Sequence, residues 1–156
     1  MPLFFQLGGT NAMSLFEQFA TNRKAEVEGV EVTFGSKNPD GTIPTFRIAR
    51  MGKTNKRYQK MLEAETKPHI HAIRNDTLSA DIDEAITLKI FLATVLLGWS
   101  GIIEPKIFGT DQAVQYTAEN GEKLFKALPE LYSTLKQQAS TMSLFRDSVV
   151  EEDSKN

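Results

Sequence analysis

The feature that most constrains the fold is an apolar run from Ile90 to Trp99 at the end of a helix-forming segment. Ser79 is a good N-cap for that segment, and acids at 81–84 suit the positive end of a helix dipole. The run is about half of the roughly 20 residues that a membrane-spanning helix needs, and Lys89 borders it. A helix that is apolar on nearly all sides is normally buried. The sequence therefore predicts a central buried helix that ends at residues 98–101.

The composition limits the classes of protein that remain. The length of 156 residues is that of one ordinary domain. The chain has no cysteine, which excludes disulfides, thiolate catalysis, cysteine-ligated zinc and iron–sulfur clusters. Lys and Arg number 18 and Asp and Glu number 20, so the net charge is −2, whereas a nucleic-acid binder is usually clearly basic. No positive flank precedes the apolar N-terminus, so we expect no secretion signal.

Residues 14–50 are expected to form a lobe made of a helix and a β-hairpin. Ser14 to Glu17 has the form of a capping box, and Leu15, Phe16 and Phe19 share one face of a helix that runs to about residue 26. Alternating residues at 30–34 and a returning segment at 43–49 flank strong turn chemistry at 38–41. Pro44 favours an edge position for the second strand. Residues 1–13 are expected to be a flexible extension, with Met13 as an alternative start.

Residues 54–150 are expected to form a helical body. The first helix of this body begins after Thr54 or Asn55 and is kinked or ended by Pro68. The central helix follows it, and Thr117 caps the helix after that. Pro129 begins a last helix that reaches about Val150. The expected class is α+β and mostly α-helical, with a small N-terminal β-hairpin followed by a bundle of amphipathic helices. Residues 14–150 are expected to form one domain, and 151–156 a disordered tail.

Two short motifs resemble functional sites but lack residues that such sites need. Gly52-Lys53-Thr54 lies between a strand and a helix, but Arg47 occupies the position of the first glycine of a phosphate-binding loop. His69 and His71 have no third ligand at a suitable spacing, whereas zinc sites use three or four. Carboxylates are scattered over predicted helix faces. We therefore expect no enzyme, no cofactor, and no catalytic or metal-binding residue.

The segment from Arg47 to Lys60 is basic, with no acidic residue between Asp40 and Glu63. Such a stretch is either a solvated helix face or a contact for phosphate or an acidic protein partner. Trp99 and Tyr116 lie beside predicted loops and are candidate interface anchors, although Trp99 equally suits the core at a helix end. The predicted partner-binding residues are Arg50, Lys53, Lys56, Arg57, Tyr58, Lys60, Trp99 and Tyr116.

Short segments of the second half, taken in their order and spacing, resemble the tail assembly chaperones of long-tailed (siphovirus-like) bacteriophages. The similarity runs from about Asn55 to the C-terminus. Its segments are residues 55–62 with Lys67-Pro68, residues 97–102 around Trp99, residues 116–120, residues 128–131, and Phe145-Arg146 with the acidic ending.

The resemblance implies a protein of the host cytoplasm that binds the tape measure protein, keeps it soluble and helps recruit tail tube subunits during tail morphogenesis. It also implies self-association and no membrane. Two other functions stay open from the residues alone. One is a structural minor tail or head–tail connector protein of the virion. The other is a small nucleic-acid-binding protein that uses residues 47–60, against which the acidic net charge argues.

Overall fold

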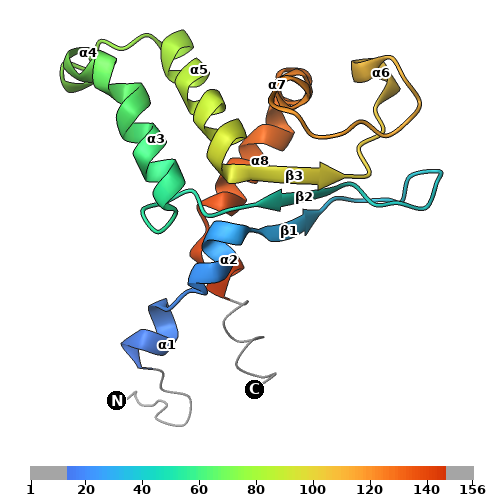
Figure 1. The fold of residues 1–156 in the computed structure, drawn as a ribbon, viewed down its shortest axis with the longest axis horizontal. Helices are drawn as coiled ribbons and strands as arrows, with labels where there is room; N and C mark the ends of the chain where they lie inside the picture. Colours follow the sequence, from blue (N-terminus) through green and yellow to red (C-terminus); the bar gives the residue numbers. More distant parts are fainter. Residues whose placement is uncertain (1–13, 147–156) are drawn as a thin grey trace, which may run out of the picture.

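The computed structural model describes residues 14–146 of the chain. A three-stranded antiparallel sheet lies at the centre, and helices surround it (Figure 1). The strands are β1 (Val30–Thr33), β2 (Thr45–Ile48) and β3 (Leu96–Ser100), in the order β1-β2-β3. The predicted extension at 1–13, the alternative start at Met13, the tail at 151–156 and the end of the last helix at Val150 lie outside the described residues.

The predicted β-hairpin is confirmed, but its second strand is not at an edge. Val30 lies opposite Ile48 in the β1–β2 pair, and β2 also pairs with β3, where Phe46 lies opposite Trp99. The edge prediction from Pro44 was wrong because this proline precedes β2. Its carbonyl accepts a hydrogen bond from the Phe34 N–H at 3.0 Å, and no N–H of the β2 ladder is lost.

The predicted central helix is shorter than expected. Helix α5 spans Ala80–Ile90, a π-helical turn η4 covers Phe91–Val95, and the chain then enters β3. The prediction that the helix ends at 98–101 was therefore wrong. The reason is that β2 offers a hydrogen-bonding edge to residues 96–100, while Leu96, which is only 1% exposed, stays in the core in the strand conformation.

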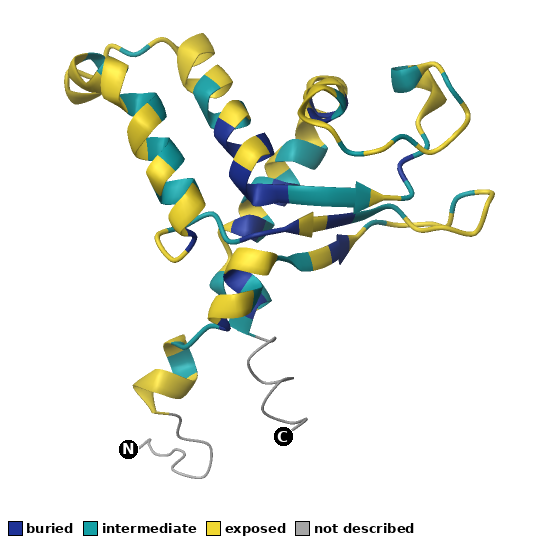
Figure 2. Ribbon diagram, in the orientation of Figure 1, coloured by how far each residue is buried: buried dark blue, intermediate teal, exposed yellow. Residues whose placement is uncertain are grey.

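The predicted N-terminal helix is divided into α1 (Leu15–Phe19) and α2 (Arg23–Glu28). The Ser14 hydroxyl accepts a hydrogen bond from the Glu17 N–H at 3.1 Å, as the capping box predicts, but Asn22 caps a second helix. The apolar face of α1 is not buried. Leu15 and Phe16 are 75% and 77% exposed, and Figure 2 shows α1 as mostly exposed.

The helical body contains α3 (Lys56–Thr66), α4 (Ile70–Arg74), α6 (Pro105–Phe108), α7 (Ala118–Ala127) and α8 (Pro129–Ala139). A 3₁₀ turn, η3 (Lys67–His69), contains Pro68 and separates α3 from α4. Asn55 caps α3, Ser79 caps α5 and Thr117 caps α7. The last predicted helix is interrupted after α8 and resumes at 142–146.

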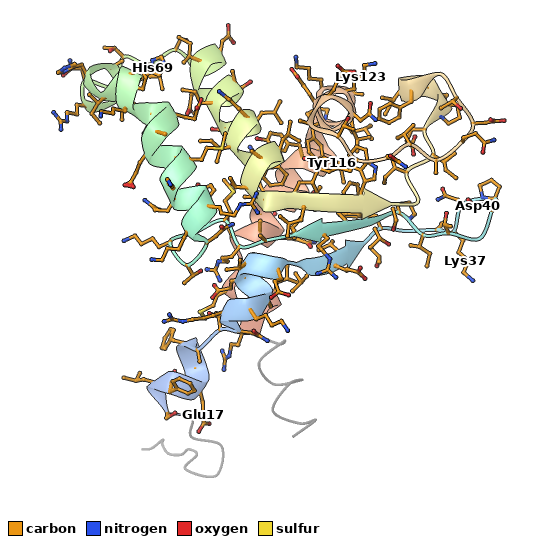
Figure 3. All side chains as sticks on the ribbon, viewed as in Figure 1. Glu17, Lys37, Asp40, His69, Tyr116 and Lys123 are labelled. Carbon is orange, nitrogen blue, oxygen red and sulfur yellow. The ribbon has the colours of Figure 1, made fainter. Side chains whose placement is uncertain are left out.

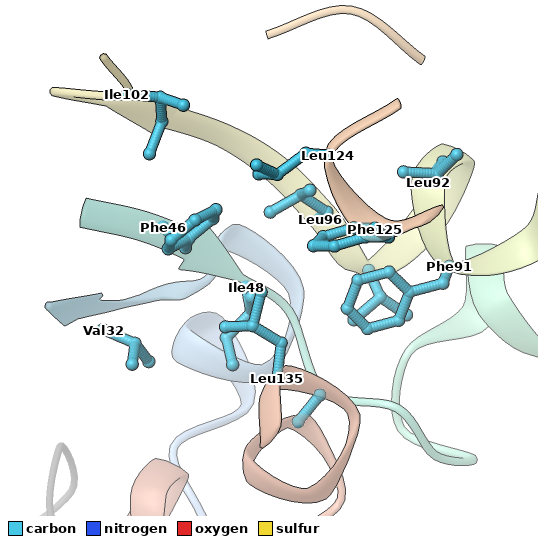
Figure 4. Packing of buried hydrophobic residues seen from close by; sticks show 12 residues of the cluster. Val32, Phe46, Ile48, Phe91, Leu92, Leu96, Ile102, Leu124, Phe125 and Leu135 are labelled. Carbon is cyan, nitrogen blue, oxygen red and sulfur yellow. The ribbon is translucent and has the colours of Figure 1, made fainter. Parts of the chain in front are cut away.

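The hydrophobic core joins the sheet to the helices (Figure 4). Phe46 and Ile48 of β2 pack with Phe91 of η4, with Phe125 of α7 and with Leu135 of α8, and each of these side chains is at most 3% exposed. The expected α+β, mostly helical class is confirmed. The third strand was not predicted, and it carries the chain from α5 across the sheet towards α7.

Candidate functional site

Arg50 of the predicted basic surface is part of an interior ion pair. Its Nη1 lies 3.5 Å from the Glu26 carboxylate, and its guanidinium lies over the Phe145 ring at 5.5 Å. Glu26 is 1% exposed and also accepts hydrogen bonds from the hydroxyls of Thr21, at 2.6 Å, and Thr54, at 2.8 Å. This network ties α2 to the β2–α3 connection and to the last described helix.

Other basic residues of this stretch are also engaged within the fold. Arg47 donates to the carbonyls of Glu28 and Gly29, both at 3.0 Å, and Arg57 donates to the Ala93 carbonyl at 3.1 Å. Tyr58 is half-buried, and burial raises the pKa of its phenol. Three exposed lysines have no ion-pair partner among the described residues: Lys53, Lys56 and Lys60.

Trp99 and Tyr116 lie against each other, with ring centroids 5.0 Å apart. The Trp99 Nε1–H donates to the Val114 carbonyl at 2.9 Å, and the Tyr116 hydroxyl donates to the Leu92 carbonyl at 2.6 Å. Burial raises the pKa of Tyr116 to about 12. In Figure 3 Tyr116 lies beside β3 and α7, away from α3, so the structure does not bring the aromatic pair and the basic residues into one surface.

The phosphate-loop and histidine motifs also have a place in the fold. The Thr54 hydroxyl donates to Glu26, and His71 lies in a helix, so it does not share a strand face with His69. Residues 14–146 contain no group of three or more His, Asp or Glu placed to hold a metal ion. Within the same residues, no helix has the length and apolar character needed to cross a bilayer.

One hollow of the described residues was not predicted from the sequence. It is an open cleft of about 1190 Å³ between α5 with η4 on one side and α7 with α8 on the other. Its apolar floor includes the half-buried Leu88 and Tyr132 and the buried Leu92 and Phe125, and Met61 reaches it from α3. The helices whose residues line the cleft, α5, α7 and α8, are labelled in Figure 1.

The charged residues along the cleft are mostly acidic. Asp81, Asp83 and Glu84 come from α5, whereas Glu119 and Glu122 come from α7. The three lysines of the lining are engaged locally. Lys89 pairs with Glu65 at 2.9 Å, Lys126 pairs with Glu122 at 2.7 Å, and Lys136 lies over the Tyr132 ring at 4.2 Å.

Tyr132 is the most unusual polar residue of the lining. Its ring stacks on Phe125 with centroids 5.1 Å apart, and its hydroxyl is buried without a hydrogen-bond partner among the described residues. Burial, helped by the negative charge of Glu84, raises the pKa of this phenol to about 12. The cleft therefore combines an apolar floor with a rim that is mostly acidic.

The fold and the cleft define a small, mostly helical α+β protein with an open groove between its helices. A family model described as YdaY prophage protein matches residues 53–156, which is two thirds of the chain and includes both walls of the cleft. The chain belongs to this prophage protein family and is therefore of phage origin. Comparisons with curated proteins and with solved structures gave no match.

Proposed function

We propose that this prophage protein is a tail assembly chaperone of the host cytoplasm. It binds the tape measure protein without covalent chemistry, keeps it soluble, and helps recruit tail tube subunits. Self-association is part of the proposal. The observation that carries it is the open cleft between α5 and α7–α8. Support also comes from the phage origin of the family, whose model covers nearly the same residues as the chaperone-like segments.

The size and lining of the cleft suit a protein segment. Small-molecule pockets usually enclose about 300–1,000 Å³ and bury most of their ligand. The cleft is larger, at about 1190 Å³, and is partly open to solvent. An apolar floor between helices is the usual receptor for an amphipathic helix. A tape measure protein is long and helical, so it presents many such segments.

The test is co-expression with the tape measure protein encoded by the same prophage. We expect a soluble tape measure protein that elutes with this chain in size-exclusion chromatography. Ala85 lies in the lining of the cleft and is exposed, so Ala85→Arg blocks the groove without disturbing the core. The matched control is Ala64→Arg, an exposed position on α3 outside the cleft. An insoluble tape measure protein in the presence of the unmodified chain overturns the proposal.

A second measurement separates a chaperone from a virion component. A chaperone leaves the assembled tail, so we expect mass spectrometry of purified particles to detect the tail tube protein but not this chain. A stoichiometric amount of the chain in washed particles would instead support a structural minor tail or connector protein.

A further inference from the structure

We propose that the cleft between α5 and α7–α8 receives an amphipathic helix whose apolar face is flanked by Lys or Arg side chains. The proposal rests on the proposed function, because it names the chemistry of the segment by which the partner is held. It concerns a different surface from the basic stretch at 47–60, which was expected to be either a solvated helix face or a contact for phosphate or an acidic protein partner.

The floor sets the shape of the occupant. Leu88 and Leu92 are four residues apart along the α5–η4 wall, so their side chains follow one another along the groove. The ring of Tyr132, which stacks on the buried Phe125, borders the opposite side. An apolar stripe that recurs every three or four residues on a helix matches a floor of this kind.

The rim sets the charge of the occupant. Four carboxylates of the lining have no ion-pair partner among the described residues: Asp81, Asp83, Glu84 and Glu119. They come from both walls, whereas each lysine of the lining is engaged by a neighbouring carboxylate or ring. A helix with acidic flanks brings like charges together and is disfavoured, but one with basic flanks forms new ion pairs on both sides.

The test uses the full chain and three synthetic helical peptides of about 20 residues, long enough to be helical in water. All three carry the same leucine stripe, and the flanking positions are Lys, Gln or Glu. Fluorescence anisotropy measures the dissociation constant of each at low and high salt. We expect the Lys peptide to bind at least tenfold more tightly than the Glu peptide. The ratio of the two dissociation constants is expected to decrease at high salt, because salt screens the charges of the rim. Equal affinities, or a preference for the Glu peptide, overturn the inference.

Two sets of variants locate the effect. The rim is neutralised in the triple variant Asp81→Asn, Glu84→Gln and Glu119→Gln. This variant is expected to bind the Lys peptide about tenfold more weakly, because three partly screened ion pairs are lost, and to bind the Gln peptide with nearly unchanged affinity. The control Glu63→Gln removes an exposed acid of α3 that lies outside the cleft. It is expected to change the affinity for neither peptide. Circular dichroism and the melting temperature show that each variant is folded. A rim variant that binds the Lys peptide as tightly as the unmodified chain does contradicts the inference.

The peptide experiment and the co-expression experiment fail in different ways. If the tape measure protein is solubilised and Ala85→Arg prevents this, but the peptides show no preference for Lys, the proposed function stands and the basic occupant is wrong. If the Lys peptide binds in the cleft with the expected preference while the tape measure protein stays insoluble, the occupant is supported and the proposed partner is wrong.

Discussion

Glu26 is the residue whose replacement is expected to cost the most stability outside the apolar core. Its carboxylate is buried, lies 3.5 Å from Arg50 and accepts the hydroxyls of Thr21 and Thr54. Only 19% of the Arg50 side chain is exposed, and its Nε and Nη1 have no hydrogen-bond partner among the described residues. The Glu26 carboxylate is thus the charge that balances this guanidinium.

The substitution Glu26→Ala removes that balancing charge and the acceptor of two hydroxyls. Breaking a buried ion pair by removing one partner costs about 3–5 kcal/mol, because the remaining charge stays buried and unpaired. The whole free energy of unfolding of a domain is about 5–15 kcal/mol, so the variant is expected to be close to unfolding at 25 °C. Urea denaturation followed by circular dichroism measures the change.

A double-mutant cycle tests the reasoning behind this magnitude. With Arg50→Met already present, the guanidinium is gone and no cation is left unpaired when Glu26 is removed, so Glu26→Ala is expected to cost clearly less than it does in the unmodified chain. A cost below about 1 kcal/mol for Glu26→Ala alone, at an unchanged slope of the urea transition, would refute the argument from a buried unpaired charge. Additive costs in the cycle would refute the assignment of Arg50 as the partner.

Three further predictions test other contacts. Gly121→Ala adds helix propensity of about 1 kcal/mol, but the new Cβ would lie 2.6 Å from Leu92 Cδ2 and 3.1 Å from Tyr116 Cε1, so we expect a lower melting temperature. The pKa of Tyr116 is about 12 in the folded chain, against an ordinary value of 10.0, so the unfolded state loses the phenolic proton first. The free energy of unfolding is therefore expected to fall as the pH rises from about 10 to about 12, and to fall less in Tyr116→Phe; an equal fall in both would contradict this. Replacing Phe16 and Phe19 with Ser is expected to leave the melting temperature within the error of calorimetry, because both rings are more than half exposed.

Helix starts were the most predictable part of the fold. Ser14, Asn55, Ser79 and Thr117 each accept a hydrogen bond from an N–H three residues later, as their side chains and positions indicate. The hairpin was predictable for a similar reason, since turn chemistry and alternation are both local. The N-cap Asn22 was missed because it lies inside a segment whose apolar spacing indicated one continuous helix.

The third strand was not predictable from local pattern. Residues 90–99 form one apolar run, and a short apolar run does not distinguish a buried helix from a buried strand. The strand conformation of residues 96–100 depends on β2, which lies some 50 residues earlier in the chain and supplies their hydrogen-bonding partners. A similar limit applies to Arg50, whose interior role depends on Glu26 and Phe145 from two distant segments.

The sequence by itself determined the class of the fold, the capped starts of its helices and the hairpin, because these depend on side chains within a few residues of one another. Tertiary structure decided which charged and apolar residues share a surface. From the sequence, the acids at 81–84 were interpreted only as partners of their own helix dipole. The cleft exists only because the fold sets α5 with η4 opposite α7 with α8, since a cleft is a relation between helices and not a property of any one of them.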